Sequence, residues 1–152
     1  MSKILIIDSN KDNWDSISLL IKKYHPELEI STVESCQKAF ADAKNNCFNT
    51  ILLDIDMLGN NGFKVCQKLK SNSLTQSIPV IILTAKKIDS KIRMKGFNLG
   101  ADAFLSKPLD GEELYGQLNV MLRIKETEDR LKKERDSLRK KLADQKRQLK
   151  EE

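Results

Sequence analysis

Short apolar segments alternate along this chain with segments in which apolar residues recur at helical spacing. The alternation repeats about five times and predicts strands near residues 3–7, 28–33, 51–54, 79–83 and 101–105. Helices are predicted near residues 12–24, 35–46, 63–69 and 89–100, with a last helix from Asp110 onward. Parallel strands need crossover connections, and these are right-handed. The pattern therefore predicts an α/β fold, a doubly wound parallel sheet with helices on both faces.

Small polar residues mark the predicted helix starts. Side-chain oxygens of Ser, Asn and Asp can accept a hydrogen bond from the free amides of a first helical turn. The predicted caps are Asn10 or Asp12, Ser35 and Asp110, and Asp89 is predicted to begin the fourth helix. Gly100 is predicted to end the fourth helix, since glycine is the common residue after a helix.

Polar residues follow four of the predicted strands: Asp8, Asp54, Thr84 and Lys107. The carboxyl ends of parallel strands share one edge of the sheet, where open α/β sheets bind ligands. A single Asp after a strand is most often a turn former or a helix cap, so the convergence of four residues carries the argument. Carboxylates attract Mg²⁺, a hydroxyl and an ammonium can bind phosphoryl oxygens, and Asp can itself accept a phosphoryl group.

Five motifs occur in an order that resembles the receiver domains of bacterial response regulators. They are residues 4–8, residues 52–57 with Gly62, residues 82–85, residues 100–102 and residues 104–108. Each motif is weak alone, but the ordered set is specific. The resemblance covers about residues 3–122, and it implies the flavodoxin-like strand order 2-1-3-4-5.

This resemblance implies a role for each residue at the sheet edge. Asp54 would be the phosphoacceptor, served by a histidine kinase or a phosphotransfer protein. Asp8, Asp54 and the backbone carbonyl of Asp56 would hold Mg²⁺. Thr84 and Lys107 would bind the phosphoryl oxygens.

The resemblance also implies a switch. Phe104 would turn inward when Thr84 moves toward the phosphoryl group, and the Lys107–Pro108 peptide bond would be cis.

The sequence departs from the family pattern beside the site. Most receiver domains have two adjacent acids after the first strand, whereas here Ser9 follows Asp8. Ser9 is a poorer Mg²⁺ ligand than a carboxylate, so weak Mg²⁺ binding is expected. Leu58 stands where a proline is common. Asp56 and Lys86 either face each other across the pocket or are two solvated charges.

The chain is predicted to divide into a receiver domain, residues 1–122, and a helical extension, residues 123–152. Ile124, Leu131 and Leu138 recur every seven residues and fit heptad d positions, while Met121, Leu142 and Leu149 fit a. A parallel coiled-coil homodimer is the favoured interpretation, followed by a single-helix linker. A helix for nucleic acid is the least favoured, because its charges are mixed. An output domain is expected after Glu152.

Charge, hydropathy and cysteine spacing bear on where the protein acts and on which kinds of site it can carry. The extension holds most of the excess positive charge, with twelve Lys or Arg against eight Asp or Glu from Met121 to Glu152. No apolar stretch is long enough for a membrane span and no signal peptide is present, so a cytoplasmic protein is expected. Three cysteines without metal-type spacing are predicted to be buried free thiols; they are Cys36, Cys47 and Cys66.

A phosphoryl-accepting signalling switch, rather than a turnover enzyme, is the main hypothesis. One alternative is a phosphatase of the haloacid dehalogenase type, since Asp54-Ile55-Asp56, Thr84 and Lys107 mimic the motif order of that family. The missing acidic pair after the lysine counts against it. The other alternative is a receiver-like interaction module that works without phosphorylation.

Overall fold

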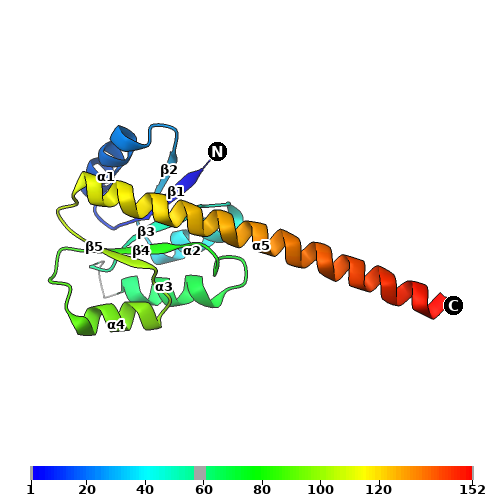
Figure 1. Ribbon diagram of the computed structural model, residues 1–152. Coiled ribbons are helices and arrows are strands. Elements are labelled where there is room, and N and C mark those ends of the chain that lie inside the picture. Colours follow the sequence, from blue (N-terminus) through cyan, green and yellow to red (C-terminus); the bar gives the residue numbers. More distant parts are fainter. Residues whose placement is uncertain (1, 57–60, 152) are drawn as a thin grey trace.

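The computed structural model describes residues 2–56 and 61–151, and a single five-stranded sheet forms its centre (Figure 1). The strands are β1 (Lys3–Ile7), β2 (Glu29–Val33), β3 (Thr50–Asp54), β4 (Val80–Thr84) and β5 (Ala103–Ser106). They pair in parallel in the order β2-β1-β3-β4-β5. The α/β fold and the strand order 2-1-3-4-5 are therefore confirmed.

Five helices connect and cover the strands: α1 (Lys11–Tyr24), α2 (Cys36–Asn45), α3 (Asn61–Ser71), α4 (Ser90–Asn98) and α5 (Gly111–Glu151). Helices α1 and α5 share one apolar core with one face of the sheet, through residues such as Ile17, Ile21 and Leu118. Helices α2, α3 and α4 cover the other face. Every residue of β3 and β4 is buried, as expected for central parallel strands.

The polar caps lie where the sequence predicts them. Asn10, Ser35 and Asp89 each accept a hydrogen bond from a first-turn amide of α1, α2 and α4, respectively. Asp110 Oδ1 accepts from the Glu112 amide at the start of α5. Gly100 follows α4 with φ of 99°, a conformation that favours glycine.

The cysteine prediction is wrong in part. Cys66 is buried, and burial raises the pKa of its thiol to about 11, because an apolar environment disfavours the thiolate. Cys36 is half-buried and Cys47 is exposed. Cys47 lies in the loop between α2 and β3, where no helix face covers it.

Helix α5 begins on the sheet and continues far beyond it (Figure 1). Leu114, Leu118 and Met121 are buried, and Ile124 packs partly against the same core. After Lys125, every residue of α5 as far as Glu151 is exposed. No helix in the described parts of the chain is long and apolar enough to cross a membrane.

Candidate functional site

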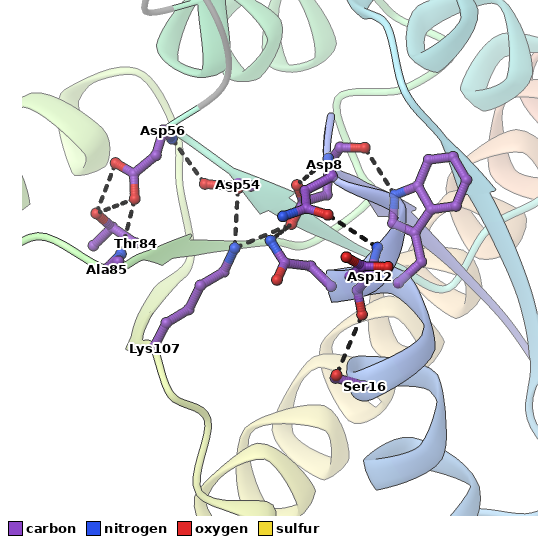
Figure 2. A network of polar contacts seen from close by, with 11 residues as sticks. Asp8, Asp12, Ser16, Asp54, Asp56, Thr84, Ala85 and Lys107 are labelled. Atoms are coloured by element: carbon purple, nitrogen blue, oxygen red, sulfur yellow. Dashed lines mark hydrogen bonds and ion pairs between the residues drawn. The ribbon is translucent and has the colours of Figure 1, made fainter.

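Four polar side chains predicted from the sequence lie at the carboxyl edge of the sheet (Figure 2). Asp8 follows β1, Asp54 ends β3, Thr84 ends β4 and Lys107 follows β5. Lys107 Nζ lies 3.0 Å from Asp8 Oδ2 and 3.0 Å from Asp54 Oδ2. The ammonium group thus joins residues that are 53 and 99 positions away in the sequence.

Asp8 is held by the first turn of α1. Its Oδ1 accepts from the Asn10 amide at 2.9 Å, and its Oδ2 accepts from Asn13 Nδ2 at 3.2 Å. The Trp14 indole donates to the Asp8 backbone carbonyl at 2.7 Å. Only 1% of the Asp8 side chain is exposed, so the Asn10 and Asn13 donors replace the hydration that its carboxylate loses. Asn13 thereby orients a carboxylate of the site and Trp14 holds the backbone beneath it, roles that their helical spacing alone did not indicate.

Asp54 faces Lys107 with one oxygen and the following loop with the other. Its Oδ1 accepts from the Asp56 amide at 2.8 Å, while its Oδ2 accepts from Lys107. The side chain is 7% exposed. The carboxylate is therefore fixed in orientation at the end of the central strand, with one edge turned toward the ammonium.

Burial and charge shift the pKa values of this pair. Burial raises the pKa of the Asp54 carboxyl, and the hydrogen bonds from Lys107 and from the Asp56 amide only partly offset the effect. Burial alone would lower the pKa of Lys107, but its hydrogen bonds to Asp54 and Asp8 raise that pKa above its usual value. Lys107 consequently stays a cation at neutral pH, next to a carboxylate that is more basic than usual.

Asp56 contacts the end of β4. Its Oδ1 and Oδ2 accept from the Thr84 hydroxyl at 3.0 and 3.1 Å, and its Oδ2 also accepts from the Ala85 amide at 2.8 Å (Figure 2). Of the two alternatives for Asp56 and Lys86, the facing pair is not seen: no ion pair joins these two described residues, and Lys86 is exposed. Asp56 is not simply solvated either, because its carboxylate accepts from Thr84 and Ala85.

The remaining predicted residues lie around this core of the site. Ser9 is exposed in the turn after β1. Phe104 is half-buried on β5 and packs edge-to-face on Phe97, with ring centroids 5.1 Å apart. The Lys107–Pro108 peptide bond is cis, as the resemblance implies. Leu58 lies outside the described residues.

The oxygen atoms at this edge suit a hard divalent cation. Asp8 and Asp54 supply two buried carboxylates that already converge on one positive charge, the Lys107 ammonium. In the described part of the chain, no group of three or more His, Cys, Asp or Glu residues could hold a metal ion. Mg²⁺ commonly takes one or two carboxylates and keeps several waters, so this set fits Mg²⁺ better than a metal that needs a full protein cage.

Comparison with known proteins agrees with this geometry. Residues 4–119 match the response regulator receiver domain family. This chain belongs to that family. The response regulator PleD of Caulobacter vibrioides (strain NA1000 / CB15N) is 36% identical over 133 residues, which cover 86% of this chain and 28% of PleD. ArlR of Staphylococcus saprophyticus is 32% identical over 125 residues, covering 81% of this chain and 53% of ArlR.

A solved structure of a two-component response regulator from Clostridium difficile superposes with a TM-score of 0.71 at 29% identity, covering 81% of this chain and 97% of that chain. This chain is thus a receiver domain, the signalling switch of a two-component system. It spans about a quarter of PleD and half of ArlR. The match of residues 4–119 to the receiver family and the strand order 2-1-3-4-5 favour the receiver over the haloacid dehalogenase hypothesis.

Proposed function

We propose that Asp54 is the phosphoacceptor of this receiver domain and that its phosphoryl donor is a phosphohistidine on a histidine kinase or phosphotransfer protein. An Asp54 oxygen forms the new bond to phosphorus, and the bond from phosphorus to the donor imidazole breaks. The imidazole nitrogen leaves with the bonding electrons and takes up a proton. The observation that carries the proposal is the placement of Lys107 Nζ, 3.0 Å from an oxygen of both Asp54 and Asp8.

Each neighbour of Asp54 has a role in this transfer. The Lys107 ammonium offsets negative charge that gathers as the phosphoryl group arrives. Thr84 supplies a hydroxyl donor at the end of the next strand. Bound Mg²⁺, held by Asp8, Asp54 and the backbone carbonyl of Asp56, would neutralise the phosphoryl oxygens. With Ser9 in place of a second acid, the carboxylates that serve the cation are those of Asp8 and Asp54, and Mg²⁺ affinity is correspondingly low.

A groove beside Lys107 offers the donor protein a docking face. Its volume is about 430 Å³, and it runs between α1 and the loop before α5. Apolar side chains of Ile17, Leu20 and Leu109 line it, together with Lys107 and Pro108. A helix that carries the phosphohistidine could rest its apolar side here, with the histidine directed toward Asp54. We place this phosphoryl transfer in the cytoplasm, where the donor protein would meet this chain.

Mass spectrometry after treatment with acetyl phosphate and Mg²⁺ tests the acceptor. We expect one phosphoryl group per chain in the wild type and none in Asp54→Ala. Asp12→Asn is the matched control, because Asp12 is an exposed acid on α1 near the site whose side chain makes no contact with it. This variant should be labelled like the wild type. Label that persists in Asp54→Ala would refute the assignment, and an unlabelled wild type would favour the interaction-module hypothesis.

A further inference from the structure

The carboxylate of Asp56 engages two hydrogen-bond donors at the end of β4. The Thr84 side chain is fully buried, and its hydroxyl has one proton to donate. Its oxygen already accepts from the Lys86 amide at 3.1 Å, so the proton is directed to Asp56. The Ala85 amide donates to the same carboxylate at 2.8 Å. Both donors are therefore used by a negative charge that belongs to the protein itself.

These donors lie on the strand next to Asp54, since β3 and β4 pair with Asp54 opposite Leu83. A phosphoryl group on Asp54 needs donors for its oxygens, and Thr84 is the hydroxyl that serves it in the proposed function. We propose that Asp56 is a built-in anion which occupies part of the phosphoryl-binding site before phosphorylation. The incoming phosphoryl group must displace it, so Asp56 sets the threshold of the switch. This inference rests on the proposed function.

The surroundings of Asp56 allow such an exchange. Its backbone is anchored, because its amide donates to Asp54 Oδ1 at 2.8 Å. Its side chain is half-buried and borders solvent. A side-chain rotation is thus enough to release Thr84 and Ala85, and the freed carboxylate regains water as its partner. Phosphoryl oxygens then take the two vacated donors, so one anion replaces another without a change in the fold.

Beryllofluoride, which mimics a phosphoryl group on Asp, measures the displacement in the full chain. The affinity of the protein for beryllofluoride in the presence of Mg²⁺ can be followed by the fluorescence of Trp14, whose indole donates a hydrogen bond to the Asp8 carbonyl. Asp56→Ala removes the competing carboxylate and keeps the backbone carbonyl. We expect at least about tenfold tighter binding, since the hydrogen bonds to a charged group no longer have to be broken.

Two controls distinguish occupation of these donors by Asp56 from a general effect of removing a negative charge near the site. Asp12→Asn removes a nearby exposed acid that touches neither donor, and it should change the affinity by less than about threefold at about 0.15 M salt, where exposed charges are screened. In a Thr84→Ala background, the gain from Asp56→Ala should be clearly smaller, because the hydroxyl is absent and only the Ala85 amide is still contested. A gain that is equal in both backgrounds, or that Asp12→Asn reproduces, would overturn the proposal.

The Ala85 amide gives a readout that needs no phosphoryl mimic. Its proton resonance should move upfield in Asp56→Ala and lose protection from exchange, and an unchanged resonance would overturn the contact. Binding of beryllofluoride that is unaffected by Asp56→Ala refutes the displacement and leaves the role of Asp54 intact. Absence of binding in both the wild type and Asp56→Ala refutes the role of Asp54, and the displacement falls with it.

Discussion

The buried carboxylate of Asp54 lowers the stability of the folded protein. It is almost fully buried, it lies near the buried Asp8, and a single ammonium serves both carboxylates. Burial raises its pKa above the usual 3.8, which means that the folded state prefers the neutral form. At pH values above this raised pKa, where Asp54 is ionised, its charge lowers the free energy of unfolding. The same charge is what a phosphoryl acceptor requires.

Asp54→Asn should therefore raise the melting temperature at pH 7 to 8. An added stability of about 1 kcal/mol would raise it by a few degrees. The sign follows from linkage: the penalty of the wild type is absent below the unfolded pKa of 3.8 and grows as the pH rises through the higher folded pKa. The advantage of the variant should hence shrink on acidification. Melting curves between pH 3.5 and 8 check this, with Asp12→Asn as the exposed-acid control. A less stable Asp54→Asn at pH 7 would contradict it.

At this scale, positions along the strands were predictable and side-chain partners were not. Asp8, Asp54 and Lys107 could be predicted because parallel strands must bring their carboxyl ends to one edge. The partner of Asp56 depends on which donors face a loop residue, and neighbouring positions in the sequence pointed to Lys86 instead. Asn13 was missed because a polar residue in a first helical turn is usually solvated.

Among the elements, α4 and β5 meet at a position where a side chain does not fit. A Cβ atom on Gly96 would lie 2.2 Å from Cζ of Phe104. Gly96 is buried in the last turn of α4, where helix propensity alone favours Ala by up to about 1 kcal/mol. The missing Cβ lets the Phe104 ring lie under the helix and contact Phe97. The position of the proposed switch residue thus depends on a glycine in another element.

Gly96→Ala should destabilise the protein by about 1–3 kcal/mol despite its better helix propensity, because the ring or the helix must shift. Urea denaturation measures this, and Phe104→Leu provides the matched background, since a smaller side chain leaves room for the new methyl group. In that background Gly96→Ala should be close to neutral or stabilising. If Gly96→Ala stabilises the protein with Phe104 present, the contact does not constrain α4.

Helix ends were predicted better than helix faces. Asn10, Ser35 and Asp89 are short-range signals, because a cap bonds to amides two or three residues ahead. The packing of Gly96 on Phe104 joins two elements through tertiary structure, and no local pattern encodes it. Along the extension, Lys125 pairs with Asp129 and Asp144 with Arg147, although other residues at the same spacing there also carry opposite charges.

On the scale of the whole molecule, α5 joins the receiver to an exposed apolar stripe. The family match ends at residue 119 and the last fully buried residue is Met121, which supports the proposed boundary after residue 122. Four leucines beyond it are exposed by 52 to 72%: Leu131, Leu138, Leu142 and Leu149. Their heptad spacing is that of a coiled-coil seam, so a second copy of the helix would cover them.

The coiled-coil seam is expected to be weak, because two of its core positions are charged. Glu128 and Arg135 occupy a positions, where apolar residues pack best. A weak seam can be shifted by a few kcal/mol, which is the range that a phosphorylation switch supplies, whereas a strong seam would hold the helices in one state. Helix α5 begins at Gly111, five positions after the end of β5, and β5 carries Phe104. In the proposed switch, a change at Thr84 and Phe104 therefore has a short route along the chain to the helix.

We expect the full chain to form a parallel dimer at tens of micromolar, and a version that ends at Arg123 to be monomeric. Leu138→Glu places a charge in the d position and should dissociate the dimer, because burying an unpaired carboxylate in a seam costs several kcal/mol. Lys140→Glu is the matched control, since position 140 is an outer f position and should leave the dimer intact. Sedimentation of the four proteins, with and without beryllofluoride and Mg²⁺, measures both the seam and its coupling to Asp54. A full chain that stays monomeric under both conditions would show that the extension is only a linker. A dimer whose affinity does not change with beryllofluoride would show that dimerisation is not coupled to Asp54.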